Sequence, residues 1–260
     1  MLTINKGKKV KPVMAVIYGV EGIGKTTLAS QLPGALIVDI EKGSGNYDVA
    51  RIDNIDSLND VYNVISDLTD NAEDYHKAGY HTVVFDSIDV LENDYLIPVV
   101  VARGGRPGGV LADLEWGKGY DMELKEFTNF IDGCKLLQSK GYNVVMVVHS
   151  TVKDATPPDG PSYNHYELKL NKKIGQALKG AVDMVLFAGY HTYLTQDGNK
   201  ARGKSVSRRL ICNHCAFADA KNRYGLPNEI PLNVDQIAPF FAGYKGGEKD
   251  NDSKANETAK

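Results

Sequence analysis

Eight consecutive residues near the start of the chain have the types and spacing of a phosphate-binding loop. Residues 19–26 read Gly-Val-Glu-Gly-Ile-Gly-Lys-Thr and fit the pattern G-x-x-x-x-G-K-[ST]. Glycines let backbone N–H groups turn inward around an anion without Cβ clashes. The lysine of this pattern reaches the β- and γ-phosphates of a nucleoside triphosphate, and the next hydroxyl is a Mg²⁺ ligand. We therefore predict a nucleotide-binding loop, with Lys25 also catalytic, made of Gly19, Val20, Glu21, Gly22, Ile23, Gly24, Lys25, Thr26 and Thr27.

A carboxylate that could serve the metal follows an apolar segment further along the chain. Residues 82–85 read Thr-Val-Val-Phe, which is typical of a buried strand, and Asp86 comes directly after them. Asp86 could hold a water of the Mg²⁺ shell, or it could cap the helix that follows. The phosphate-binding loop favours the metal site, with Thr26 and Asp86 as its protein groups. Asp89, one turn later, is interpreted as a surface or capping acid.

Two other strand ends carry polar groups that could act on a bound nucleotide. Glu41 follows an apolar segment and could orient or deprotonate a water for hydrolysis, if that segment neighbours the strand of Asp86. Asp39 could fill the same role, and the periodicity of the sequence does not separate the two. His149 follows residues 144–148, where it could donate a hydrogen bond to the γ-phosphate or simply cap the strand.

An alternation of strand-like and helix-like segments must position these groups. Continuous apolar runs, expected for central strands covered on both faces, occupy residues 13–18, 35–40, 82–85 and 144–148. Apolar residues recur at helical steps from Tyr120 to Leu137, which predicts an amphipathic helix with Cys134 in the core. Strand-like residues 182–187, 190–195 and 205–213, with a turn at 196–199, predict a hairpin. We expect an α/β fold: a mostly parallel central sheet flanked by helices, with a C-terminal β-hairpin extension.

Composition limits the class of protein. The chain has 260 residues, 42% of them hydrophobic, which suffices for the core of one large α/β domain or two small ones. The longest aliphatic run, residues 144–148, is too short to span a bilayer, and residues 1–12 are polar and basic, unlike a secretory signal. Three cysteines cannot form a full disulfide set, which favours a reducing cytoplasm. We expect a polar segment at 1–12, one domain at 13–244 and a disordered tail at 245–260.

Two long segments and an uneven distribution of charge would allow the protein to bind a polyanion, but they do not require it. Residues 103–109 are basic and glycine-rich, residues 150–169 carry prolines and aromatic residues, and both segments are expected to form loops. Residues 169–209 hold nine Lys or Arg against two Asp, which fits a nucleic-acid surface or an ordinary solvated face. Trp116 could stack on a base or, as a lone Trp more often does, anchor the next helix. Residues 212–215, Cys-Asn-His-Cys, lack a second ligand pair and are interpreted as structural rather than as a metal site.

With these motifs in this order, the sequence resembles the RecA-like branch of P-loop ATPases. It is especially similar to phage-encoded AAA-type NTP-binding proteins that include RecA-like single-strand annealing proteins. The resemblance extends over residues 11–231 and implies a RecA-like fold, ATP as the nucleotide, Glu41 as the catalytic glutamate and His149 as the polar sensor. Residues 220–227 also look like the K-x-R element of RecA-like and DnaB-like hexameric motors. That likeness implies that Lys221 and Arg223 reach a neighbouring subunit's nucleotide, where a cation stabilises transition-state charge; otherwise they are ordinary loop cations.

The resemblance implies a Mg²⁺-dependent ATPase that acts on single-stranded DNA in phage-type recombination, annealing or replication. It also implies a homo-oligomer with nucleotide at its subunit interfaces and a single-strand-binding protein as a further partner. The expected location is the cytoplasm of a host cell. One alternative is a small-molecule or nucleoside kinase, for which Arg103 and Arg106 are poor candidates as lid residues. The other is a nucleotide-gated module that binds DNA or a protein partner with little turnover.

Overall fold

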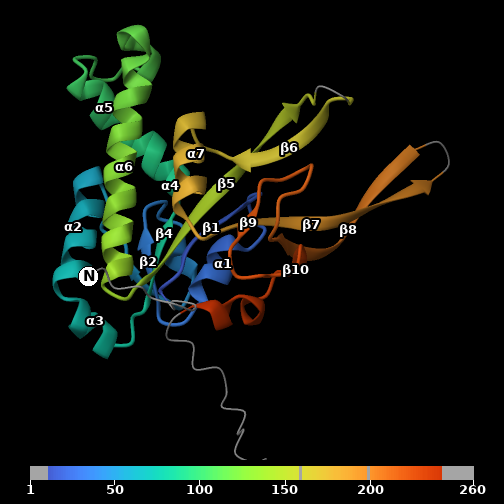
Figure 1. The fold of residues 1–260 in the computed structure, drawn as a ribbon, viewed down its shortest axis with the longest axis horizontal. Coiled ribbons are helices and arrows are strands. Elements are labelled where there is room, and N and C mark those ends of the chain that lie inside the picture. Colours follow the sequence, from blue (N-terminus) through green and yellow to red (C-terminus); the bar gives the residue numbers. More distant parts are fainter. Residues whose placement is uncertain (1–10, 158–159, 198–199, 242–260) are drawn as a thin grey trace, which may run out of the picture.

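A sheet with helices on both faces forms the body of the molecule (Figure 1). The computed structural model describes residues 11–157, 160–197 and 200–241, so most of the expected polar segment, the expected tail and the turn at 198–199 lie outside the described residues. The strands are β1 (Met14–Gly19), β2 (Ala35–Asp39), β3 (Ala50–Ile52), β4 (Thr82–Asp86), β5 (Asn143–Ala155), β6 (Tyr163–Leu168), β7 (Met184–Asp197), β8 (Lys200–Ile211), β9 (Lys221–Asn222) and β10 (Glu229–Pro231).

Most of the helical residues belong to segments that connect the parallel strands. The α-helices are α1 (Lys25–Ser30), α2 (Leu58–Asp70), α3 (Ala72–Lys77), α4 (Ile88–Val90), α5 (Ile97–Arg103), α6 (Lys118–Ser139) and α7 (Lys172–Ala181). Between and after them lie the 3₁₀ turns η1 (Ser44–Asn46), η3 (Leu111–Asp113), η4 (Glu115–Gly117), η5 (Val234–Gln236) and η6 (Ala238–Phe240), and the π-helical turn η2 (Leu91–Leu96).

The strand order is β10-β8-β7-β1-β5-β4-β2-β3. From β7 to β3 every neighbouring pair in this order is parallel, whereas β8 is antiparallel to both β7 and β10. The expected α/β fold, with a mostly parallel central sheet flanked by helices, is therefore confirmed. In this order β5 lies between the strand of the phosphate-binding loop and the strand of Asp86, which brings the carboxyl ends of β1, β5, β4 and β2 to one edge.

Both faces of the central strands are buried, as their continuous apolar sequences predict. In β1, Met14, Val16 and Tyr18 contribute to the core under α2, α5, α6 and α7. Ala15 and Ile17, which alternate with them, contribute to the core on the α1 side of the sheet. Side chains of a strand point alternately to opposite faces, so one short segment supports two hydrophobic cores and is held in a fixed position.

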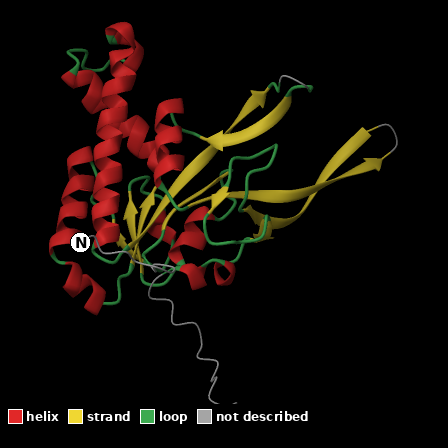
Figure 2. Ribbon diagram, viewed as in Figure 1, coloured by secondary structure: helices red, strands yellow, loops and turns green. Residues whose placement is uncertain are grey.

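Two pairs of strands extend from the body on the same side of the molecule (Figure 2). The expectation of a loop at 150–169 is wrong, because β5 continues to Ala155 and pairs antiparallel with β6, from Ser150↔Leu168 to Ala155↔Tyr163. The residues that suggested a loop, such as Pro157, lie between the two strands, where proline is tolerated. β7 and β8 form the second pair, from Phe187↔Ile211 to Asp197↔Lys200.

The amphipathic helix predicted around Cys134 is confirmed as α6, and Cys134 is completely buried. The interpretation of Trp116 as an anchor of this helix is wrong, because its side chain is 93% exposed. Leu111 and Leu114 occupy the buried positions instead, and the backbone of Trp116 is left-handed, with φ 57°. Among the described residues, no helix combines the length and the apolar character needed to cross a bilayer.

Candidate nucleotide-binding site

The segment between β1 and α1 has the backbone of an anion-binding loop. Gly24 precedes α1 with φ 104°, a conformation that favours glycine. A Cβ on Gly19 would lie 2.1 Å from the carbonyl oxygen of Ala188, so the loop passes too close to β7 for any other residue. The Lys25 side chain is buried within the loop, and its Nζ donates to the carbonyls of Gly19 and Val20, both at 3.1 Å. A buried ammonium inside a ring of backbone groups fits the phosphates of a nucleotide.

A pocket of about 510 Å³ opens over this loop at the carboxyl ends of the central strands. It brings together the phosphate-binding loop and the groups predicted at the ends of three different strands. Its lining consists of Glu21, Gly22, Gly24, Lys25, Thr26, Thr27, Asp39, Glu41, Gly43, Tyr47, Asp86, His149 and Arg208. Burial lowers the pKa of Lys25, although the carboxylates of Asp86 and Asp89 oppose the shift and favour the charged ammonium.

Thr26 and Asp86 meet at the base of the pocket, as a Mg²⁺ site requires. The Thr26 hydroxyl donates to Oδ2 of Asp86 at 2.6 Å, and Asp86 is almost completely buried at the end of β4. Burial raises the pKa of Asp86 to about 6, while the bond from Thr26 opposes the shift. A hydroxyl and a carboxylate are hard oxygen ligands, and Mg²⁺ commonly takes only one or two protein groups and completes its shell with phosphates and water. The residues present therefore fit the metal.

Glu41 and Asp39, the two candidates for activating water, lie at neighbouring points of the pocket but in different surroundings. β2 pairs with β4, as the prediction for Glu41 required, and the Glu41 N–H donates to the carbonyl of Asp86 at 3.0 Å. The Asp39 carboxylate is buried and accepts from the N–H groups of Gly43 and Ser44, both at 3.0 Å, and from the Ser44 hydroxyl at 2.7 Å. Asp39 thus holds the loop after β2, whereas the Glu41 side chain is exposed to the pocket.

His149 lines the pocket and is hydrogen-bonded to Asp89, a residue expected at the surface from the sequence. Asp89 is only 3% exposed, so its interpretation as a surface or capping acid is wrong. Its Oδ1 accepts from the backbone N–H of His149 at 3.0 Å, and its Oδ2 lies 2.9 Å from Nδ1 of the ring. The bond to Asp89 raises the pKa of His149, with burial opposing it. Burial alone would raise the pKa of Asp89, but the bonds from His149 hold it below its usual value.

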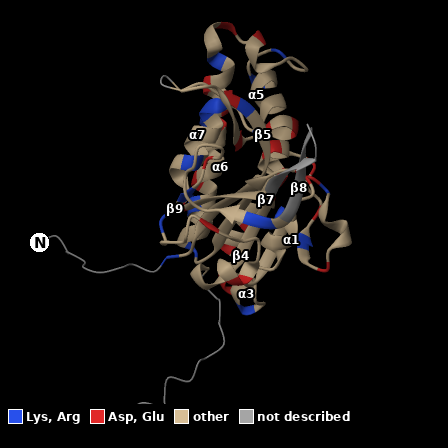
Figure 3. Cartoon of the chain, turned by 90° about the vertical axis from the view of Figure 1, so that its right-hand side faces the viewer, with Lys and Arg blue, Asp and Glu red and all other residues tan. Residues whose placement is uncertain are grey.

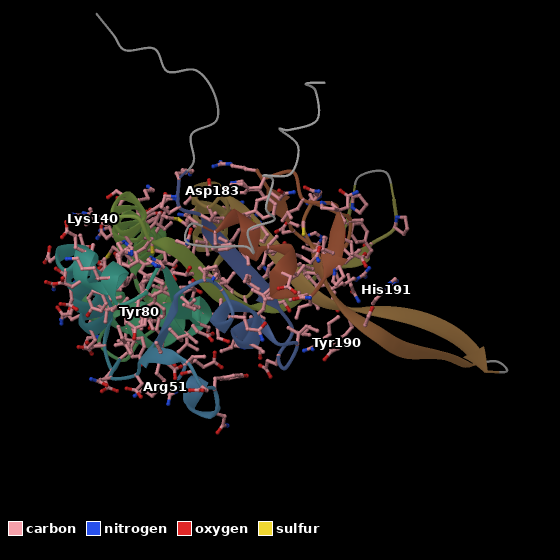
Figure 4. The ribbon with its side chains drawn as sticks, turned by 90° about the horizontal axis from the view of Figure 1, so that it is seen from below. Arg51, Tyr80, Lys140, Asp183, Tyr190 and His191 are labelled. Atoms are coloured by element: carbon pink, nitrogen blue, oxygen red, sulfur yellow. The ribbon has the colours of Figure 1, made fainter. Side chains whose placement is uncertain are left out.

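Lys221 and Arg223 do not join this pocket within one chain. Lys221 Nζ donates to the carbonyls of Lys179 and Val182, both at 2.8 Å, and so satisfies the end of α7. Arg223 pairs with Asp183 at 3.1 Å. The Asp183 N–H donates to the carbonyl of Met14 at the start of β1, so this pair lies at the amino edge of the parallel strands, the edge opposite the pocket. Figure 4 shows Asp183 across the molecule from Arg51, which holds the pocket loop through the Ser44 and Tyr47 carbonyls.

Sequence reasoning missed three contributors to the site. Asp89 was misread because an acid one turn after a strand carries no mark of burial. Tyr47 and Arg208 line the pocket, yet neither belongs to a motif. Arg208 contacts the loop across 185 positions of the chain, and no local pattern predicts a contact over that separation.

Comparison with known proteins assigns the chain to a family. Residues 11–224 match a family model described as an AAA domain. No curated protein matches the sequence at a significant level. Among solved structures, a KaiC-like protein from the hyperthermophilic archaeon Pyrococcus horikoshii is similar with a TM-score of 0.38 and 14% identity, over 77% of this chain and 79% of that chain. This last likeness is too distant to assign an activity.

Proposed function

The chain belongs to the AAA domain family, and on that premise we propose that it binds and hydrolyses ATP with Mg²⁺ and uses the cycle to act on single-stranded DNA. The observation that carries the proposal is the shared pocket. It joins a phosphate-binding loop, a Thr26–Asp86 pair suited to a metal, an exposed carboxylate at Glu41 and a hydrogen-bonded His149. These are the parts that phosphoryl transfer to water requires.

Each group has a distinct task in the proposed hydrolysis. The loop N–H groups and Lys25 hold the phosphates, and bound Mg²⁺ would neutralise charge on their oxygens. Glu41 orients a water and accepts its proton, since the competing carboxylate of Asp39 is occupied by the loop after β2. His149 Nδ1 is directed to Asp89, and in the protonated ring, which the bond to Asp89 favours by raising the pKa of His149, Nε2 also carries a proton that it can donate toward the γ-phosphate.

The surface beside the pocket supports DNA as the partner. A groove of about 200 Å³ runs between the β5/β6 pair and α7, and its lining includes Lys153, Lys172 and Lys179. Figure 3 shows Lys and Arg on α7 on the side of the molecule from which the paired strands extend. Phosphate contacts by such cations supply most of the affinity in sequence-independent binding of single strands. The exposed ring of Trp116 is a further candidate for stacking on a base.

A direct path joins this surface to the nucleotide. The Lys169 N–H, immediately after β6, donates to the carbonyl of His149 at 2.9 Å, and Lys169 Nζ lies 3.9 Å from Oδ2 of Asp89. The base of the β5/β6 pair is therefore attached to the residue proposed to contact the γ-phosphate. A change from ATP to ADP would then alter the position of the DNA-binding strands, as recombination, annealing or replication of phage type requires.

The proposed active form is a homo-oligomer. At the edge opposite the chain's own pocket, Arg223 remains 54% exposed despite its pair with Asp183. In a homo-oligomer it could reach a neighbour's nucleotide from that edge, which is the trans role proposed for it and for Lys221. A single-strand-binding protein stays a proposed further partner. A kinase is less well supported, because Arg103 pairs with Glu126 at 2.6 Å and neither it nor Arg106 is among the described residues that line the pocket.

The test is phosphate release from ATP and Mg²⁺ without any added acceptor, with and without single-stranded DNA. We expect Glu41→Gln to bind ATP normally but to release phosphate at least about 100-fold more slowly. Lys153→Ala/Lys172→Ala should lose stimulation by DNA, whereas Lys140→Ala, at the end of the molecule away from the paired strands (Figure 4), should keep it. Arg223→Ala should lose stimulation while still binding DNA. Phosphate transfer only to an added acceptor would replace the ATPase with a kinase, and ATP binding without turnover would favour the nucleotide-gated module.

A further inference from the structure

Arg208 contacts the phosphate-binding loop from a strand that no nucleotide-binding motif includes. It lies on β8, and its Nη1 donates to the carbonyl of Ile23 at 3.2 Å. The same nitrogen lies 2.9 Å from the position that a Cβ on Gly24 would take. The side chain lines the pocket together with Thr26 and Thr27 at the start of α1. A permanently charged group is thus placed at the edge of a site built for phosphates.

The neighbouring residue shows that this orientation is specific. Arg209 pairs with Glu229 at 2.6 Å, and its guanidinium lies 5.5 Å from the centre of the Phe217 ring. Successive side chains of a strand point to opposite faces. Of two adjacent arginines, only Arg208 therefore points to the phosphate-binding loop, and Arg209 provides a matched control of the same charge and type.

The sheet order indicates which part of a nucleotide Arg208 meets. Asp86 at the end of β4, His149 within β5 and Glu41 just after β2 are proposed to act at the γ-phosphate, and these three strands all lie on one side of β1. Arg208 lies on β8, on the other side of β1 beyond β7. A triphosphate that directs its γ-phosphate toward the first group therefore has its α-phosphate and ribose on the side of Arg208.

We infer that Arg208 binds the α-phosphate of the nucleotide in cis, as a binding residue that senses the presence of nucleotide rather than its γ-phosphate. This inference rests on the proposed function. A guanidinium carries five N–H donors in a planar fork, so the bond to Ile23 leaves donors for an anionic oxygen. Because β8 continues into the strand pair with β7, the contact also ties that pair to the occupied site.

The test is the Kd of the full-length protein for ATP and for ADP, with Mg²⁺, in Arg208 variants and in Arg209→Ala. A charge-assisted hydrogen bond predicts that Arg208→Ala weakens both nucleotides by a similar factor of about 10- to 100-fold. Arg209→Ala should bind within about twofold of wild type, since its side chain faces away. His149→Ala should weaken ATP more than ADP, because its proposed contact is with the γ-phosphate alone.

Two further variants separate a contact with the nucleotide from support of the loop. Arg208→Gln keeps a donor for the Ile23 carbonyl without the charge and should bind as weakly as Arg208→Ala, whereas Arg208→Lys should recover part of the affinity. Wild-type affinity in Arg208→Ala or Arg208→Gln, or a loss confined to ATP, would overturn the inference and leave the proposed function intact. A wild-type protein that binds neither nucleotide would overturn both.

Discussion

Asp86 and Asp89 belong to the same short segment and are 5% and 3% exposed, yet their environments shift their pKa values in opposite directions. Burial raises the pKa of Asp86 to about 6, because the Thr26 hydroxyl is its main compensating donor. Burial acts on Asp89 as well, but the ring and the backbone N–H of His149 outweigh it. Hydrogen-bond donors, and not depth alone, therefore decide whether a buried carboxyl favours its charged form.

The difference matches two tasks. Asp86 faces the pocket with few donors, so its charge is costly until a cation approaches, which suits a metal site. Asp89 has its oxygens occupied by His149, so its charge is already stabilised and it can hold the ring in a fixed orientation. In the proposed mechanism Asp89 positions the ring of His149, whereas Asp86 would act on the metal.

Glu92, one helical turn after Asp89, is a third buried carboxyl group of this segment. It is 2% exposed, accepts from the N–H of Asn171 at 2.9 Å and faces Glu123, which is completely buried. Burial raises the pKa of Glu92 to about 8, with the charge of Glu123 adding to the shift. Glu123 Oε1 accepts from the Asn171 side chain at 2.7 Å, but its Oε2 has no hydrogen-bond partner among the described residues. A proton shared between the two carboxyls would satisfy that oxygen.

The largest effect is expected from Asp86→Asn, which keeps the shape of the side chain and removes its charge. Because the charge is proposed to hold the Mg²⁺ shell, phosphate release should fall by about 10- to 100-fold. The measurement is turnover over a titration of Mg²⁺, with nucleotide binding in EDTA as a check that the pocket is intact. Full turnover at the Mg²⁺ concentration that wild type needs would remove Asp86 from the metal site.

A smaller effect is expected from Asp89→Asn, which leaves the metal site in place. The pKa of His149 should fall toward its ordinary value, because the bond to Asp89 is what raises it; a titration of the ring followed by NMR measures this. The free energy of unfolding near pH 6 should fall by about 1–3 kcal/mol. A histidine whose pKa is higher in the folded than in the unfolded chain contributes its full stabilisation at a pH below the unfolded pKa and none at a pH above the folded pKa. The difference in the free energy of unfolding between wild type and variant should therefore shrink as the pH rises through the pKa of His149. An unchanged ring titration would contradict the coupling.

An effect of opposite sign, on stability and not on turnover, is expected from Glu92→Gln. A folded pKa of about 8, against 4.5 in the unfolded chain, means that the folded state binds the extra proton between these values, so wild-type stability falls as the pH rises through this window. The side chain introduced by Glu92→Gln cannot ionise, so the stability of the variant relative to wild type should rise with pH. At pH 8.5 its Tm should exceed that of wild type by about 2–4 °C for each 1 kcal/mol of difference in the free energy of unfolding. Thermal unfolding at pH 5 and pH 8.5 measures this. Glu115→Gln, at an exposed position, is the control and should show no such trend.

Much of the fold and of the candidate site followed from the sequence. The apolar runs located β1, β2, β4 and the buried half of β5, because strands covered on both faces must be apolar throughout. The site residues Lys25, Glu41, Asp86 and His149 all line one pocket, since parallel strands bring their carboxyl ends to the same edge. The loop expected at 150–169 was wrong, because prolines between two strands look the same in sequence as prolines in a long loop.

The sequence by itself determined the phosphate-binding loop, because its donors come from consecutive residues and its glycines fix the backbone locally. Only the tertiary structure decided which carboxyl groups are buried, in which direction their pKa values shift and which arginine faces the loop. Asp89 meets His149 across 60 positions, and Arg208 meets Ile23 across 185. A pKa depends on the donors and the burial supplied by such distant partners. Residue types alone therefore predicted the chemistry available to this protein, and the packing of the sheet decided where that chemistry is placed.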